Sequence, residues 1–291
     1  MNIRVVLFAL WSSLTMAGSL VAAAVAAPSM KDIVYATVGG KPLALDLYLP
    51  PAKNPKPPLV VYVHGGAWTT GSKAQYPAFL VEHGFAVASL DFRSSSEAPF
   101  PADIHDIKAG IRFLRAKAPE LGYRVDRIAI AGASSGGHLA ALVGVTNGNK
   151  ELEGTEGDYL KESSAVQAVV SYFGASDLTT ILAQSTPAGL AVREPALKRL
   201  LGNSPDAVPE LARQASPVFH VDEHSPPLFL LHGDQDTQMP VNQALELQSV
   251  YESAGRPVEV LFLHGVGHDG GPFFRDEPVK RVVTFLEHHI G

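Results

Sequence analysis

The protein has 291 residues, 46% hydrophobic and 18% charged, with a formal net charge of −6 at pH 7. These values are ordinary for a globular chain of one large domain or two small ones. There is no cysteine, which excludes disulfides, thiol nucleophiles and thiolate metal sites. Basic residues form no cluster, so neither nucleic acid nor an anionic membrane is an expected partner.

The first 26 residues have the layout of a secretory signal peptide. Arg4 precedes an apolar region that begins at Val5, and small residues follow at the end of this region. We expect cleavage after Ala26 or Ala27, which leaves a secreted or periplasmic domain of residues 27–291. The stretch from Val5 to Ala27 is also long enough for an uncleaved membrane anchor, but its Ala-rich second half is weakly hydrophobic and favours cleavage.

Apolar runs of strand length alternate with helical patterns along the rest of the chain, as in a mostly parallel sheet flanked by helices. Residues 43–49 alternate with period two and predict a half-exposed antiparallel edge strand. Ile104, Ile107, Ile111 and Leu114 lie at helical spacing. We predict strands buried on both faces at residues 59–63, 86–90, 128–130, 166–173, 228–231 and 258–263.

Residues 178–225 interrupt this alternation. The segment is rich in proline and holds only a short helical pattern, around residues 196–201. Such an excursion between two strands predicts a small cap-like insertion over the sheet, where substrate specificity is often determined.

A nucleophile motif lies between a predicted strand and a predicted helix. Residues 132–136, GASSG, match the pattern G-x-S-x-G, in which a sharp strand-to-helix turn exposes the central serine. Ser134 has glycine two residues away on both sides, whereas Ser135 has Ala133 and Gly137 at that distance. This favours Ser134 as the nucleophile and leaves Ser135 to contribute its backbone N–H to an oxyanion hole.

A base and an orienting acid follow in the chain order expected for such a serine, each after a predicted strand. For the base we favour His268, which follows Gly265 and Gly267, over His264, which lies nearer its strand. For the acid we favour Asp236 over Asp234, whose position also suits a turn. Asp177, which follows another strand, ranks third.

Histidine and two glycines follow the strand at residues 59–63, in the sequence HGGAW. A histidine-diglycine loop in this position supplies the second part of an oxyanion hole in esterases. Trp68 in this loop is predicted either to wall the substrate pocket or only to pack. His220 and His224 have a metal-ligand spacing but lie between two prolines, so we predict no metal site there.

These motifs together resemble the α/β-hydrolase esterases of the feruloyl and acetylxylan esterase type, the BD-FAE-like group, which is related to the hormone-sensitive-lipase-like carboxylesterases. The resemblance covers about residues 33–290 and implies the α/β-hydrolase fold. It also implies a catalytic triad of Ser134, Asp236 and His268. The oxyanion N–H groups would come from Gly66, Ala67 and Ser135, and no cofactor is implied.

Two positions depart from the pattern of these esterases. Ala67 replaces the third glycine of the lipase-like HGGG loop but keeps its N–H, and Asp269 follows the predicted base where glycine is frequent. We therefore expect Asp269 to border the substrate pocket, as Trp68 does under the first of its two alternatives.

The leading hypothesis is a secreted serine carboxylic-ester hydrolase acting on short-chain or plant-wall-type acetyl or feruloyl esters. An arylformamidase or a prolyl-oligopeptidase-like amidase is the alternative, because both share parts of these motifs. A binding protein that has lost catalysis is a third hypothesis, but no triad member is missing. The sequence leaves the natural ester and the oligomeric state open.

Overall fold

The computed structural model describes residues 27–51 and 56–291, so the predicted signal peptide lies outside the described residues. Within this part of the chain, eight strands form a single sheet in the order β1-β2-β4-β3-β5-β6-β7-β8. β2 pairs antiparallel with β1 and β4, and all the other neighbours are parallel. The strands are Met30–Val38 (β1), Lys41–Tyr48 (β2), Pro58–Val63 (β3), Ala86–Leu90 (β4), Arg124–Ala133 (β5), Ala168–Tyr172 (β6), Leu228–Gly233 (β7) and Val258–Leu263 (β8).

The two edges of the sheet differ from the prediction. The predicted edge strand is β2, which is antiparallel but lies second from the edge, so that Leu43, Leu45 and Leu47 are buried. The edge strand itself is β1, in which polar and apolar residues do not alternate strictly, so the sequence gives no strand pattern there. β8 was predicted to be buried on both faces, but it forms the opposite edge and none of its residues is fully buried, because it has a neighbour on one side only.

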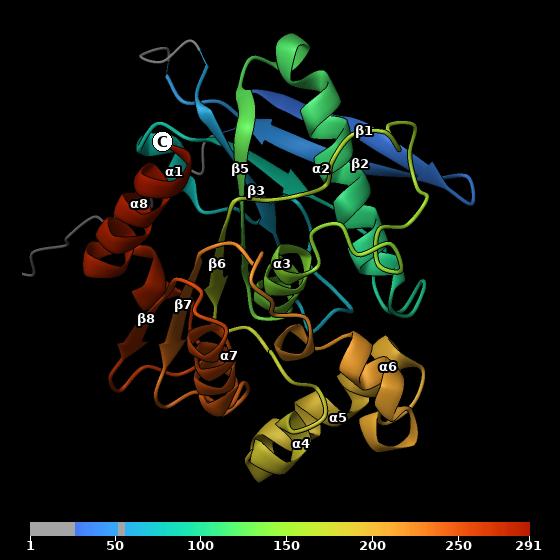
Figure 1. Ribbon diagram of the computed structural model, residues 1–291, viewed down its shortest axis with the longest axis vertical. Helices are drawn as coiled ribbons and strands as arrows, with labels where there is room; N and C mark the ends of the chain where they lie inside the picture. The colour runs from blue at the N-terminus through green and yellow to red at the C-terminus, as the bar shows by residue number, and fades with distance from the viewer. Residues whose placement is uncertain (1–26, 52–55) are drawn as a thin grey trace, which may run out of the picture.

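Helices cover both faces of the sheet (Figure 1). One face carries α2, α3 and α7, and the other carries α1 and α8. Each face of the sheet has its own cluster of buried apolar residues. The predicted stripe from Ile104 to Leu114 is buried in α2, as expected. These helices are Ala78–Glu82 (α1), Ala102–Leu121 (α2), Ser135–Val145 (α3), Asn242–Ser253 (α7) and Asp276–Ile290 (α8).

The segment between β6 and β7 folds into short helices beside α3 and α7 (Figure 1). Its longest helix extends well beyond the short helical pattern that the sequence predicted, and it contains Pro195. Thr186 caps this helix by accepting a hydrogen bond from the Gly189 N–H. The helices are Ile181–Gln184 (α4), Pro187–Leu201 (α5), Pro205–Ala207 (η1), Pro209–Gln214 (α6) and Pro217–Phe219 (η2).

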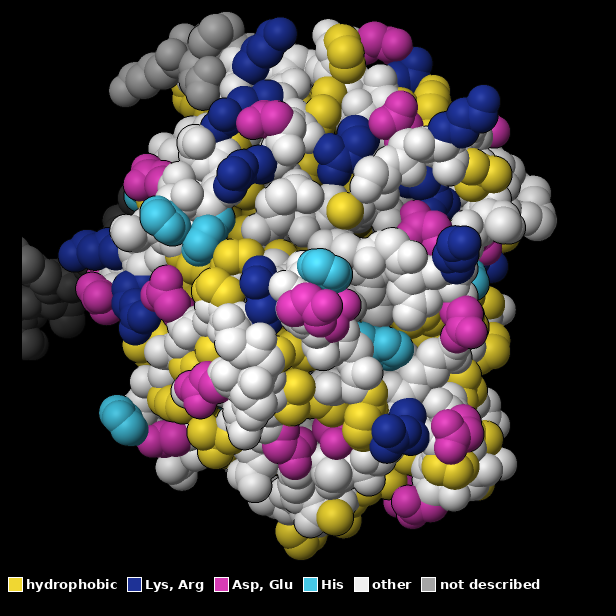
Figure 2. All heavy atoms as spheres, in the orientation of Figure 1, with side chains coloured by type: hydrophobic (Ala, Val, Ile, Leu, Met, Phe, Trp, Pro, Cys, Tyr) yellow, Lys and Arg dark blue, Asp and Glu magenta, His cyan; other side chains and the backbone are white. Residues whose placement is uncertain are grey.

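In the part of the chain that the structure describes, no helix is long and apolar enough to cross a membrane. Figure 2 shows acidic and basic side chains interspersed over the face that it draws.

A buried charge cluster holds the loop after α3 against α2. The Lys108 side chain is completely buried and donates to the Thr146 carbonyl at 2.7 Å and to the Glu153 carboxylate at 3.2 Å. Arg112 and Ser164 also donate to this carboxylate, at 2.7 and 2.8 Å. Burial lowers the pKa of Lys108, while the Glu153 charge opposes that shift. Glu153 therefore supplies the counter-charge for Lys108 and Arg112, whose side chains are shielded from solvent.

Replacing Glu153 by Gln should lower the free energy of unfolding by about 2–4 kcal/mol, because it leaves buried cations without a counter-charge. Glu120→Gln, which removes an exposed helical pair with Lys117, should change it by less than about 0.5 kcal/mol. Urea unfolding of both variants measures the difference. Equal effects would contradict the role of Glu153.

Candidate active site

The backbone turns sharply between β5 and α3, and Ser134 is the residue at the turn. Its φ of 56° and ψ of −122° are unusual for a non-glycine residue. A Cβ on Gly132 would lie 2.2 Å from the Gly136 carbonyl oxygen, and a Cβ on Gly136 would lie 2.1 Å from that of Val63. Both glycines are therefore required by the close approach of β3, β5 and α3, as the motif predicted.

The two adjacent serines have different surroundings. Ser134 is half-buried and borders a cavity, whereas Ser135 is only 1% exposed and begins α3. As the first residue of this helix, Ser135 has an N–H with no acceptor inside the helix. The Ser134 hydroxyl is thus the one that a ligand can reach.

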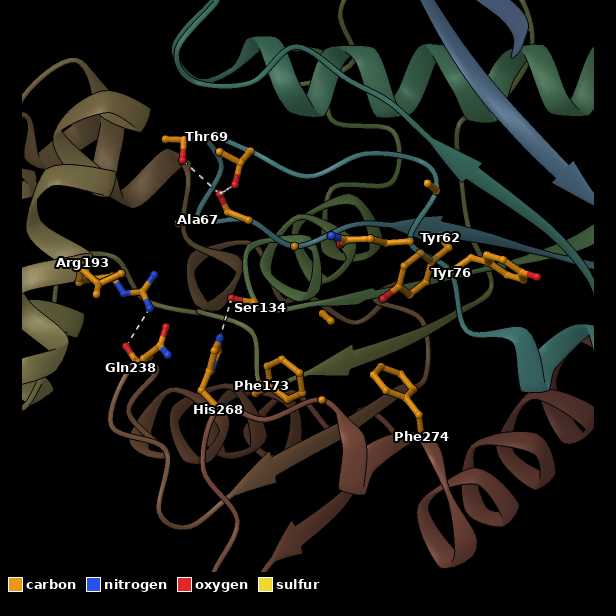
Figure 3. Close-up of a pocket in the computed structure, with 18 residues that line it drawn as sticks. Tyr62, Ala67, Thr69, Tyr76, Ser134, Phe173, Arg193, Gln238, His268 and Phe274 are labelled. Atoms are coloured by element: carbon orange, nitrogen blue, oxygen red, sulfur yellow. Dashed lines mark hydrogen bonds between the residues drawn. The ribbon is translucent and has the colours of Figure 1, made fainter. Parts of the chain in front are cut away.

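Hydrogen bonds join three of the predicted site residues (Figure 3). The Nε2 atom of His268 lies 2.9 Å from the Ser134 Oγ, and its Nδ1 atom lies 2.6 Å from the Asp236 Oδ2. The Phe173 ring packs edge-on against the imidazole, with 4.8 Å between the ring centroids. A neutral imidazole in this place donates from Nδ1 to Asp236 and accepts at Nε2 from the serine hydroxyl.

Asp236 is anchored by the backbone of its own loop. Its Oδ1 accepts from the N–H groups of Gln238 and Met239, at 2.9 and 2.7 Å. Burial acts to raise the pKa of Asp236, but the bond and charge of His268 outweigh it, so that the pKa is lowered overall. The carboxylate therefore stays ionised and fixed in the orientation that His268 needs.

The other candidate residues lie outside this arrangement. His264 and Asp234 pair with each other at 2.8 Å, and the His264 side chain is 88% exposed. Asp177 accepts from the N–H and the hydroxyl of Thr179, at 2.8 and 2.6 Å. None of the three lines the cavity beside Ser134.

The histidine-diglycine loop packs directly against the turn at Ser134. A Cβ on Gly65 would lie 2.9 Å from the Ala133 carbonyl oxygen and 3.4 Å from the Ser134 Cβ. The next residues, Gly66 and Ala67, have φ of 128° and 53°. Their N–H groups donate to no backbone acceptor among the described residues. This loop therefore keeps free donors at the edge of the cavity that contains Ser134.

The cavity at Ser134 has a volume of about 600 Å³. Figure 3 shows an aromatic side, with Tyr62, Tyr76 and Phe274, and an opposite side where Arg193 and Gln238 lie. Among the residues that the structure describes, no aspartate or glutamate lines the cavity. An apolar or aromatic group fits against the first side, whereas the second side offers polar and charged groups.

Two residues predicted to border the pocket do not line it. Trp68 is buried beneath its loop, 2% exposed, and its indole N–H donates to the Nδ1 of His138 at 3.0 Å. Asp269 is exposed and accepts from the N–H of Gly271 at 3.0 Å. Of the two alternatives for Trp68, packing is the one that the structure shows, since its ring belongs to the core cluster.

Several lining residues carry no sequence motif. Phe173 directly follows β6, at the same edge of the sheet as the predicted site, so its place after a strand is a usable signal. Arg193 and Val192 come from α5, within the segment between β6 and β7. Nothing in a proline-rich stretch indicates which of its side chains reach the cavity.

No group of three or more potential ligands that could hold a metal ion occurs in residues 27–51 and 56–291. His220 uses its Nε2 to donate to the Gln214 carbonyl at 2.8 Å, and His224 points outward, with its side chain 82% exposed.

The BD-FAE family model matches residues 45–251. The chain belongs to the BD-FAE family. This confirms the family resemblance, and the eight-stranded sheet agrees with the α/β-hydrolase fold that it implied.

Among curated relatives of this BD-FAE protein is the esterase LipC of Mycobacterium tuberculosis, 33% identical over 72% of this chain and 52% of LipC. The chain thus spans about half the length of the first curated relatives that it matches. Among solved structures, a truncated carbohydrate esterase from gut microbiota is 32% identical with a TM-score of 0.79, covering 89% of this chain and 95% of that one. A propionate-bound esterase from Thermogutta terrifontis is 26% identical with a TM-score of 0.73, covering 90% and 94%.

The His138 side chain links α3 to two other segments and should make stability depend on pH. Its Nδ1 accepts from Trp68 and its Nε2 donates to the Ala215 carbonyl at 2.7 Å, which is possible only for the neutral ring. Burial lowers the pKa of His138 from 6.5 to about 4. Between these values the unfolded chain binds a proton that the folded chain does not, so this contribution to stability is present above pH 6.5 and is lost as the pH falls toward 4.

We expect His138→Gln to flatten the fall in melting temperature between pH 6.5 and 4, by removing a difference on the order of 3 kcal/mol. His224→Gln, at an exposed position, is the control and should keep the wild-type slope. Thermal unfolding followed by circular dichroism across this range measures both. A His138→Gln variant with an unchanged slope would refute the assignment.

Proposed function

We propose that the protein is a serine carboxylesterase that acts through an acyl-enzyme formed on Ser134. The observation that carries the proposal is the chain of hydrogen bonds from Ser134 through His268 to Asp236, at the wall of a cavity that also holds free backbone N–H groups. The names of the relatives, which are esterases, support the same reaction class.

In the acylation step, the Ser134 Oγ attacks the ester carbonyl carbon while the Nε2 of His268 takes the hydroxyl proton. Asp236 accepts the Nδ1–H bond and stabilises the imidazolium. The N–H groups of Gly66, Ala67 and Ser135 donate to the oxygen that becomes negative. As the tetrahedral intermediate collapses, His268 returns the proton to the departing alcohol, and the acyl group stays on Ser134.

In the second step, water hydrolyses the acyl-enzyme. His268 takes a proton from the water as its oxygen attacks the acyl carbon, and then gives the proton to Ser134. The acid product leaves and the serine hydroxyl is restored. Every proton in this cycle passes through one imidazole nitrogen.

Short-chain acyl esters and acetyl or feruloyl esters of plant-wall carbohydrates are the proposed substrates. The propionate-bound relative and the carbohydrate esterase support this class. The aromatic side of the cavity, with Tyr62, Tyr76 and Phe274, gives a feruloyl ring or an apolar acyl chain a surface to pack on. We also propose that the protein acts outside the cytoplasm, as expected from residues 1–26.

An amidase is the second candidate activity, since the same triad chemistry cleaves amides. The relatives favour the ester. Rates on an acetyl ester, N-formylkynurenine and a peptide amide, measured side by side, distinguish the two activities. A protein that hydrolyses none of these and is not labelled by an organophosphate would be a binding protein instead.

Ser134→Ala should lower kcat/KM on 4-nitrophenyl acetate by at least about 10³-fold, because the nucleophile is lost. Ser135→Ala should retain activity within about threefold, since this residue acts through its backbone N–H. Initial rates of both purified variants, with wild type as the reference, make the measurement. A Ser135→Ala loss as deep as that of Ser134→Ala would show that the serines are assigned in the wrong order.

Asp236→Asn should reduce kcat by about 10³- to 10⁴-fold, because an amide cannot hold His268 in the required tautomer. Asp234→Asn provides the matched control: it is the same substitution two residues away, in the exposed pair with His264, and should cost less than about twofold. The kcat values for 4-nitrophenyl acetate decide between them. A larger loss in Asp234→Asn would reverse the assignment of the acid.

A further inference from the structure

Arg193 brings an unpaired positive charge to the cavity. The residue lies on α5, is only 2% exposed, and is one of the residues that line the cavity with Ser134 and His268. Figure 3 shows its guanidinium extending from α5 toward these two residues. The proposed mechanism assigns no step to this group.

The protein satisfies little of the hydrogen-bonding capacity of this guanidinium. Nη2 donates to the Gln238 carbonyl at 2.8 Å, and the group lies over the Trp68 ring, 5.5 Å from the ring centroid. Nε and Nη1 are buried and have no partner among the described residues. Asp236 has its oxygens engaged by His268 and by two backbone N–H groups, and it forms no ion pair with Arg193.

The charge nevertheless persists at neutral pH. Burial lowers the pKa of Arg193 to about 10, and the Asp236 charge works against that shift. A buried cation without an ion-pair partner is costly, and no acidic side chain of residues 27–51 or 56–291 lines the cavity that Arg193 borders. An anionic group on a ligand removes that cost, and the planar fork of an arginine matches the two oxygens of a carboxylate.

We propose that Arg193 is a specificity-determining residue that binds a carboxylate on the substrate. The preferred esters would then carry an acidic group a few atoms from the scissile bond, on the side of the cavity that Arg193 and Gln238 line. The inference rests on the proposed esterase function. The carboxylate belongs either to the acyl part, as in a half-ester of a dicarboxylic acid, or to the alcohol part, as in an acetylated hydroxy or uronic acid.

Two matched pairs of esters separate these sources. Mono-4-nitrophenyl glutarate and 4-nitrophenyl pentanoate differ by a carboxylate on the acyl side. 3-Acetoxybenzoate and phenyl acetate differ by a carboxylate on the alcohol side. In each pair the ratio of kcat/KM for the anionic ester to that for the neutral ester is measured, after subtraction of spontaneous hydrolysis.

Arg193→Met should lower this ratio by about tenfold to a hundredfold in one of the pairs, and that pair identifies the source. Arg199→Met is the matched control, since it makes the same substitution at an exposed position of α5 and should leave both ratios unchanged. Arg193→Lys keeps a charge but loses the fork, so its ratio should fall by less. If Arg193→Met does not fold, Arg193→Lys is measured in its place, because it too should lower kcat/KM for the anionic ester more than for the neutral one.

A purely structural role makes a different prediction. If Arg193 only ties α5 to the loop at Gln238, each substitution lowers the rates for anionic and neutral esters equally in both pairs, and the ratios stay constant. That result would overturn the proposal.

A binding measurement tests Arg193 without relying on catalysis. By calorimetry, benzoate should bind the Ser134→Ala protein at least about tenfold more tightly than benzamide, its uncharged counterpart, and adding Arg193→Met should abolish the difference. Equal affinities in Ser134→Ala would refute carboxylate recognition. A protein that hydrolyses no ester but shows the Arg193-dependent preference would refute the esterase and keep the anion site, so the two failures are distinguishable.

Discussion

The site depends on one steric constraint, the crowding where β3, β5 and α3 meet. Here a Cβ on Gly136 would lie 2.1 Å from the Val63 carbonyl oxygen, and a Cβ on Gly132 would lie 2.2 Å from the Gly136 carbonyl oxygen, so neither position has room for a side chain. This close approach allows the chain to reverse direction within one residue, and Ser134 takes the left-handed φ that the reversal requires. The same contact brings the loop after β3 against the turn. Ser134 and the free N–H groups of Gly66 and Ala67 are thus positioned by a single packing arrangement.

The parts of the site that depend on local backbone geometry could be predicted from the sequence. Glycines flanking a serine, after a buried strand and before a helix, indicate a turn whose sterics allow few alternatives. The positions of His268 and Asp236 followed from parallel strands ending at one edge of the sheet. The sequence also favoured Asp236 over Asp234, and the structure supplies the reason. Asp236 turns inward because the N–H groups of Gln238 and Met239 bind its carboxylate, whereas Asp234 faces His264 at the surface.

What the sequence could not reveal involves contacts between distant segments. The sequence left Trp68 open between the pocket and the core, and its indole N–H binds a buried acceptor on His138, seventy residues away. The sequence indicates that β2 and β8 are strands, but how deeply their side chains are buried depends on the order of strands in the sheet. No local pattern encodes that order. The cavity-facing side of α5 is similarly hidden, because a helix beside the sheet can present any of its faces until its packing partners are known.

Three side chains beside the histidine-diglycine loop connect these long-range contacts. His138 joins the indole of Trp68 to the Ala215 carbonyl, and the guanidinium of Arg193 lies over the same indole. Arg193 is held by the Gln238 carbonyl and not by Asp236, which matters because a guanidinium on the Asp236 carboxylate would compete with the imidazole of His268. Its guanidinium borders the same cavity as Ser134 and His268, and under our proposal it favours an anionic group there over a cationic one. The segment between β6 and β7 therefore brings a positive charge to a site whose other residues come from the turn after β5 and from the loops after β3, β7 and β8.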